Sequence, residues 1–98
     1  RLSTYEYNVG YHYYRTGWLP GAVDRFKVLL ERDPEFTRRD SVYFYLGESY
    51  AKVGQPAMAL PYFDRLVQEF EQSEHLVEAQ KRVELLKAEM ANQAKKVP

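Results

Sequence analysis

An internal repeat of 37 residues constrains the fold of this chain more than any other feature of its sequence. Identical residues recur at this spacing: Gly10 and Gly47, Tyr13 and Tyr50, Gly17 and Gly54, Ala22 and Ala59, Phe26 and Phe63, and Leu29 and Leu66. Periods of about 20 to 50 residues are typical of repeat architectures, in which each unit buries its core against its neighbours. The 98 residues accommodate two such units and one further helix.

The repeated small residues have a physical role. Gly10 and Gly47 lie at positions where we expect two helices to cross, because small residues let backbones approach closely and leave room for aromatic rings beside them. Gly17 and Gly54 follow the first helix of each unit, where glycine adopts a positive φ at little steric cost. Each unit is therefore predicted to be a helix, a tight turn and a second helix.

This spacing resembles the tetratricopeptide repeat. The first copy is Glu6-x-x-Val9-Gly10-x-x-Tyr13 with Ala22-x-x-x-Phe26 and Pro34, and the second is Tyr43-x-x-Leu46-Gly47-x-x-Tyr50 with Ala59-x-x-x-Phe63. Glu71 stands where a second closing proline would be. The resemblance implies an all-α fold, an α-solenoid of two such hairpins plus a C-terminal capping helix. We expect a single domain over 1–98, with repeat one at about 3–36, repeat two at about 40–72 and the capping helix at about 73–93.

The hydrophobic periodicity predicts helices over 4–16, 20–32, 41–53, 56–71 and 74–92. Ser3 and Glu6 have the spacing of a capping box for the first helix. Asp40 or Ser41 is the expected cap of the third helix, and Ser73 that of the fifth. Pro61 lies inside the fourth helix and predicts a mild kink, because it has no N–H for the carbonyl of Ala57.

The fifth helix has a single apolar seam. Its members, spaced by three and four residues, are Leu76, Ala79, Val83, Leu86 and Met90. Such a seam either packs on the fourth helix or awaits a partner. We favour packing, because the end of a solenoid needs a helix with a polar outer face.

Composition excludes several classes of protein. The chain has 14 basic and 14 acidic residues, so it lacks the electrostatic footprint of a general nucleic-acid binder. It has no cysteine, which excludes disulfides and thiolate metal sites. No apolar run approaches the roughly 18 residues of a membrane span. Because Ser3 stands one step before the first helix, we expect a fragment of a longer protein whose membrane anchor, if any, lies outside it.

No residue pattern indicates catalysis. His12 and His75 are far apart, and neither has a second ligand at i+4, so we interpret His12 as a partly buried packing residue. Carboxylate pairs such as Glu69 and Glu71 fall at solvated helix ends, where nothing suggests the desolvation that an acid–base pair would need. A phosphate-binding glycine loop and a serine elbow are also missing. The prediction is a protein that is not an enzyme and has no cofactor or metal.

In solenoids of this kind the first helix of each pair lines the concave wall. The residues placed there as candidate protein-binding residues are Tyr7, Tyr11, Tyr14, Arg15, Phe44, Glu48 and Lys52. Aromatic side chains on such a wall offer a large contact area at low entropic cost. The alternative is that Tyr11 and Tyr14 pack on preceding helices outside this sequence. An exposed first helix also predicts weak self-association.

Tetratricopeptide proteins that hold chaperone C-termini carry a carboxylate clamp of Lys and Asn on this wall. Tyr7 and Tyr11 occupy the corresponding positions of the first repeat here. This departure argues against a receptor for chaperone tails.

Residues 7–34 also resemble the later repeats of the BamD/YfiO family, periplasmic lipoproteins of the outer-membrane β-barrel assembly machinery. The shared features are the tyrosine-rich first helix, a glycine turn, Ala22-x-x-Arg25-Phe26 and the closing Pro34, followed later by Phe70-Glu-Gln-Ser73 and Ala79-Gln-Lys-Arg-Val83. The resemblance implies the C-terminal half of such a scaffold, located in the periplasm at the inner face of the outer membrane. Its partners would be the periplasmic modules of the barrel-inserting subunit. The alternative is a general tetratricopeptide adaptor that binds an unfolded or extended peptide in its concave aromatic groove.

Overall fold

The computed structural model describes residues 2–95 and is all-helical over that range, with no strand. The helices are α1 (Leu2–Thr16), α2 (Leu19–Arg32), α3 (Arg39–Lys52), α4 (Pro56–Glu69) and α5 (Leu76–Lys95). The predicted all-α class is confirmed, and the predicted helices match the observed ones to within three residues at each end. None of the helices within the described range is long and apolar enough to span a membrane.

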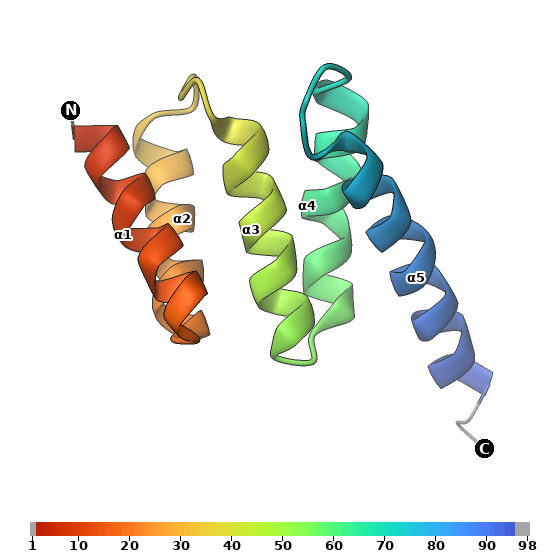
Figure 1. The fold of residues 1–98 in the computed structure, drawn as a ribbon. Coiled ribbons are helices and arrows are strands. Elements are labelled where there is room, and N and C mark those ends of the chain that lie inside the picture. Colours follow the sequence, from red (N-terminus) through yellow and green to blue (C-terminus); the bar gives the residue numbers. More distant parts are fainter. Residues whose placement is uncertain (1, 96–98) are drawn as a thin grey trace.

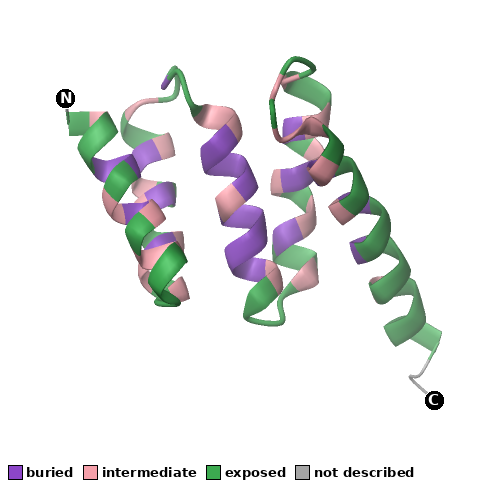
Figure 2. Ribbon diagram, viewed as in Figure 1, coloured by how far each residue is buried: buried purple, intermediate pink, exposed green. Residues whose placement is uncertain are grey.

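Each helix packs against the next one along the chain, and α1 also touches α3. Figure 1 shows the result, a row of antiparallel helices with α1 and α5 at opposite ends. The row measures 50 × 29 × 21 Å. The centre of the row is α3, whose residues are buried along most of its length, as Figure 2 shows.

The same contact between a glycine and a phenyl ring joins the two helices of each hairpin. A Cβ placed on Gly10 would lie 2.7 Å from the ring of Phe26, and one on Gly47 would lie 2.6 Å from the ring of Phe63. Both rings are fully buried, at 0% exposure. A side chain of any size at either glycine would displace the ring from its place in the core.

Glycine also ends α1 and α3 in the same way. Gly17 has φ +91° and Gly54 has φ +80°, a region that L-residues seldom adopt. The residue after each glycine donates its backbone N–H to a carbonyl five residues earlier, from Trp18 to Tyr13 and from Gln55 to Tyr50, both at 2.9 Å. This is the Schellman arrangement, which satisfies the free carbonyls at a helix end.

The predicted capping box at the start of α1 is wrong. The helix already includes Leu2, and the hydroxyl of Ser3 donates to the carboxylate of Asp33 at 2.7 Å. Glu6 accepts a hydrogen bond from Arg25 of α2 at 3.2 Å. Both side chains are therefore used between α1 and the second helix of the hairpin.

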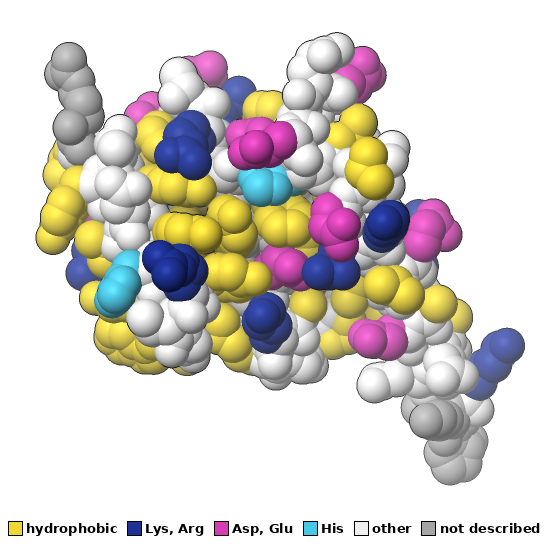
Figure 3. Space-filling model, in the orientation of Figure 1, with side chains coloured by type: hydrophobic (Ala, Val, Ile, Leu, Met, Phe, Trp, Pro, Cys, Tyr) yellow, Lys and Arg dark blue, Asp and Glu magenta, His cyan; other side chains and the backbone are white. Residues whose placement is uncertain are grey.

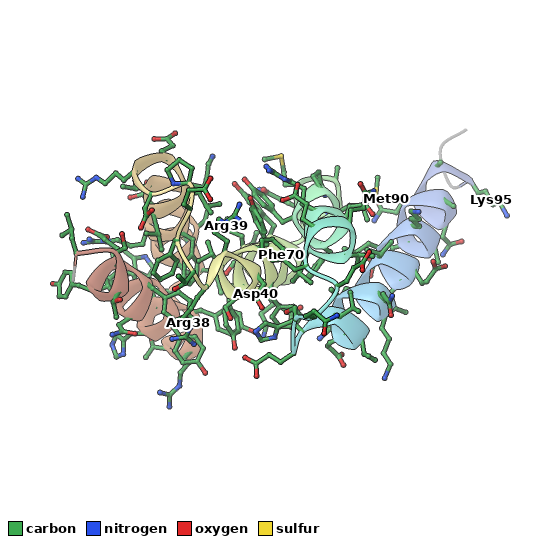
Figure 4. All side chains as sticks on the ribbon, turned by 90° about the horizontal axis from the view of Figure 1, so that it is seen from above. Arg38, Arg39, Asp40, Phe70, Met90 and Lys95 are labelled. Atoms are coloured by element: carbon green, nitrogen blue, oxygen red, sulfur yellow. The ribbon has the colours of Figure 1, made fainter. Side chains whose placement is uncertain are left out.

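The predicted cap of α3 is also wrong, because tertiary partners take the side chains of Asp40 and Ser41. Helix α3 begins at Arg39, Asp40 accepts a hydrogen bond from the hydroxyl of Ser73, and Ser41 lies beside His75. The Ser73 hydroxyl also accepts the backbone N–H of His75 at 3.0 Å, which is the bond expected of its predicted role as the cap before α5. Figure 4 shows Asp40 at the start of α3, beside Arg38 and Arg39.

The apolar seam of α5 packs on α4. Ala79, Val83 and Leu86 are buried and belong to the same core as the two hairpins, so the seam is covered within the chain. Helix α4 runs on through Pro61, and the mild kink expected there stays a prediction. At the other end of the row, Tyr5 is 62% exposed on α1.

The glycine–phenyl contact predicts that the effect of Gly47→Ala on stability changes sign when the ring of Phe63 is removed. Gly47→Ala should destabilise the protein by about 1 to 2 kcal/mol, because overpacking against Phe63 outweighs the gain of about 1 kcal/mol in helix propensity. With Phe63→Leu already present, the ring is gone and the same Gly47→Ala change should stabilise the protein. Urea unfolding followed by circular dichroism measures both effects. An equal effect in the two backgrounds would show that the ring does not impose the glycine.

Candidate protein-docking surface

The structure divides the predicted wall residues into two groups. Tyr7 and Phe44 are core residues with 4% and 7% exposure, and Glu48 is buried at 8%. The members that reach the surface are the half-buried Tyr11 and Tyr14 and the exposed Arg15 and Lys52. The three buried residues pack inside the protein and do not form an exposed wall, whereas a role of the whole set in protein binding stays a prediction.

Tyr7 joins α1 to the core and to the loop that follows α2. Its ring lies 5.9 Å from that of Phe26 and 6.0 Å from that of Phe36. The guanidinium of Arg38 lies over the Tyr7 ring at 4.4 Å, and one of its nitrogens is 3.4 Å from the Tyr7 hydroxyl. Burial raises the pKa of Tyr7 above the usual value. These contacts make Tyr7 a structural residue.

Phe44 joins α3 to the start of α5. Its ring is stacked on the imidazole of His75, with centroids 4.5 Å apart and planes 11° apart. The Nε2 atom of His75 lies 3.0 Å from the hydroxyl of Ser41. His75 is thus a packing residue, whereas His12 is exposed, contrary to our interpretation of it as partly buried.

Glu48 holds α5 against α3. Its two carboxylate oxygens accept hydrogen bonds from Arg82 at 2.7 and 3.0 Å, and Arg82 also pairs with Glu78 at 3.4 Å. The bonds to Glu48 are the main reason why the pKa of Arg82 is raised. A paired, bidentate arginine of this kind fixes geometry as well as charge. Sequence reasoning missed this pair, since its members are 34 residues apart.

Tyr11 and Tyr14 pack forward onto α3. The ring of Tyr45 lies 5.0 Å from each of them, measured between centroids. The alternative prediction, that Tyr11 and Tyr14 pack on helices preceding this sequence, is therefore not needed to explain their burial. Tyr45 itself was missed, because the repeat register places it opposite Asn8 and gives no aromatic signal there.

Three cations surround these rings. Arg15 lies over Tyr11 at 5.8 Å, Lys52 over Tyr14 at 5.2 Å and Arg38 over Tyr7 at 4.4 Å. Such placements over aromatic faces are favourable by about 0.5 to 1 kcal/mol at exposed sites. We use the name tyrosine–cation patch for this surface, whose members are Tyr11, Tyr14, Arg15, Arg38, Tyr45 and Lys52. Figure 3 views this side of the molecule and shows hydrophobic side chains gathered over its middle, with charged side chains of both signs around them.

Two hollows elsewhere in the surface share no residue with the tyrosine–cation patch. A cavity of about 580 Å³ lies between α2 and the turn that joins α3 to α4, and is lined by side chains such as Val23, Tyr50 and Val53. A second, of about 400 Å³, is lined by charged side chains of both signs, among them Lys27, Glu31 and Arg39. Within residues 2–95, the structure has no group of three His, Cys, Asp or Glu side chains placed to hold a metal ion.

Comparisons with known proteins give no independent assignment: neither the family models nor the curated proteins searched contain a match to this chain.

The Glu48–Arg82 pair predicts a clear difference between a buried and an exposed ion pair. Arg82→Met should lower the free energy of unfolding by about 2 kcal/mol, because it leaves the carboxylate of Glu48 buried without a partner. The matched control is Arg65→Met, which breaks the exposed pair with Glu69 and should cost less than about 1 kcal/mol. Adding Glu48→Gln to Arg82→Met should restore part of the loss. Chemical denaturation tests all three, and similar losses for Arg82→Met and Arg65→Met would contradict the assignment.

The tyrosines predict a loss of stability in alkali. Burial, followed by the neighbouring Tyr11, raises the pKa of Tyr45, and burial also raises the pKa of Tyr14. The native state therefore holds these protons more tightly than the unfolded chain, where tyrosine has a pKa of about 10. Stability from these groups is complete below that pH and decreases as pH rises through the native values.

Urea unfolding at neutral pH and above about pH 10 should show this decrease, and Tyr45→Phe should make it smaller. The control is Tyr5→Phe, which changes an exposed tyrosine of α1. If Tyr45→Phe and Tyr5→Phe lose the same amount of stability in alkali, the loss does not come from the Tyr45 cluster.

Proposed function

We propose that this protein is a non-catalytic scaffold for protein–protein interaction, built as a tetratricopeptide solenoid. One observation carries the proposal: the same hairpin occurs twice, each with a phenyl ring on a helical glycine and a positive-φ glycine at the turn. Stacked hairpins of this kind present extended surfaces along successive helices, and solenoid proteins use such surfaces for binding. Here the first helices of the two hairpins, α1 and α3, are followed by α5.

The proposed setting is the assembly of outer-membrane β-barrel proteins, at the periplasmic side of the outer membrane. Support comes from the resemblance of residues 7–34 to the later repeats of the BamD/YfiO family. The partners would then be the periplasmic modules of the barrel-inserting subunit, and any lipid anchor would belong to chain outside this sequence.

A second candidate is a general tetratricopeptide adaptor that captures an extended peptide. The tyrosine–cation patch favours it, because half-buried aromatic rings beside exposed cations are typical of binding surfaces. The buried positions of Tyr7 and Phe44 limit the available surface to Tyr11, Tyr14 and Tyr45 with their flanking cations.

The first test is an NMR titration of the isotope-labelled protein with the periplasmic modules of a barrel-assembly subunit from the same source. We expect saturable shifts confined to one face of the helical row. A monodisperse, folded protein that shows no shifts would remove the outer-membrane assignment and leave the adaptor as the better candidate. An unrelated folded domain of similar charge is the control, because it reports non-specific contact.

A further inference from the structure

We propose that the tyrosine–cation patch binds an extended, acidic segment of a protein partner. The carboxylates of the segment face Arg15, Arg38 and Lys52, and its apolar side chains lie on the rings of Tyr11, Tyr14 and Tyr45. This inference rests on the proposed scaffold function and names the chemistry of the partner.

The first support is that Lys52 is left without an internal partner. Glu48 lies one helical turn before it, a spacing at which Glu and Lys ordinarily pair. Arg82 instead occupies both oxygens of Glu48, at 2.7 and 3.0 Å. Within residues 2–95, Lys52 has no carboxylate oxygen within 4.0 Å, so its charge faces solvent over the Tyr14 ring.

Arg15 and Arg38, like Lys52, have no carboxylate partner among the described residues. Both are exposed, and neither forms an ion pair with a carboxylate of the described residues. Arg38 contacts only the ring and hydroxyl of Tyr7 among its polar and aromatic neighbours. Arg15, Arg38 and Lys52 thus bring to one face three positive charges that have no carboxylate partner among the described residues. A positive surface selects and steers a negative partner.

Most carboxylates near the patch are already in use, and the exception is Glu74, whose 77% exposed side chain lies 3.7 Å from His75. Glu48 and Glu78 both pair with Arg82, and Asp40 accepts the hydroxyl of Ser73. The patch thus has donors in excess of acceptors. An incoming carboxylate would form charge-assisted hydrogen bonds with these cations without displacing an internal one.

The tyrosines supply the apolar floor. Tyr45 is held between Tyr11 and Tyr14 at 5.0 Å from each ring, so the three rings are ordered before a ligand arrives. Rigid rings lose little entropy on binding, and their hydroxyls are hydrogen-bond donors while they stay protonated. Tyrosine hydroxyls are protonated at neutral pH, and burial raises the pKa of Tyr14 and Tyr45 further.

The spread of the cations indicates an extended ligand. Arg38 lies just before the first residue of α3, and Lys52 is the last residue of that helix. The two are therefore about 20 Å apart along the helix axis. An extended chain covers that distance with about six residues. Alternating side chains of such a chain point to opposite sides, so only every second residue faces the patch, and those residues must include both acidic and apolar ones.

The test uses a defined probe, a capped octapeptide with Glu and Phe in turn at every second position and Ser between them, added to the isotope-labelled protein at low ionic strength. We expect saturable shifts at the six patch residues and their neighbours. A peptide with Gln in place of Glu should bind about tenfold more weakly, and added salt should weaken only the acidic peptide. Equal binding of the Glu and Gln peptides, or shifts on another face, would overturn the proposal.

A pair of variants separates this site from general charge attraction. Arg15→Gln combined with Lys52→Gln should weaken binding of the acidic peptide about tenfold. The matched control is Lys81→Gln combined with Lys87→Gln, which removes two exposed positive charges from α5 and should leave binding unchanged. All four side chains are exposed, and circular dichroism verifies that both variants fold. Equal weakening by the two variants would overturn the proposal.

Two further outcomes distinguish this inference from the scaffold function. If the barrel-assembly modules bind both double variants equally, the scaffold function stands and the patch is not the docking site. Concentration-dependent association in sedimentation that disappears in the Arg15 and Lys52 variant would show that a second copy of this chain covers the patch. That result would also overturn the proposed acidic partner.

Discussion

The contact of a phenyl ring with a helical glycine is the constraint on which the rest of this structure depends. Phe26 lies on Gly10 and Phe63 lies on Gly47, each ring fully buried and closer than any Cβ would allow. This contact sets the close approach of the two helices in each hairpin. The remaining core residues then pack beside the rings, and the surfaces of α1 and α3 follow from how those helices are turned.

Polar side chains hold the hairpins and the start of α5 together on the side of the row where the α2–α3 and α4–α5 loops lie (Figure 1). Ser3 bonds Asp33, Ser73 bonds Asp40, and Ser41 lies beside His75. Their members are 30 to 34 residues apart, and at Ser3 and Asp40 these pairs replace the local helix caps that their spacing would otherwise suggest. Ser73 serves both roles, because its hydroxyl donates to Asp40 and accepts the backbone N–H of His75.

The surface chemistry is a consequence of this internal pairing. Arg82 takes both oxygens of the buried Glu48, which would otherwise be the natural partner of Lys52. Docking of α5 therefore completes the fold and, at the same time, leaves a cation free beside the tyrosines. Balanced charge over the whole chain conceals this local excess, because pairing distributes the carboxylates unevenly.

The sequence by itself determined the helices, their turns and the ring-on-glycine contacts. These depend on local spacing: a glycine after a helix needs a positive φ at Gly17 and Gly54, and the recurrence of Gly and Phe at 37 residues marks the same crossing twice. Only the tertiary structure decided that Tyr7 and Phe44 are buried and that Tyr45 lies between Tyr11 and Tyr14. It also decided the partner of Glu48. Such pairings join residues more than 30 positions apart. Which of several side chains becomes the partner depends on distances in the folded protein, and no local sequence pattern encodes those distances.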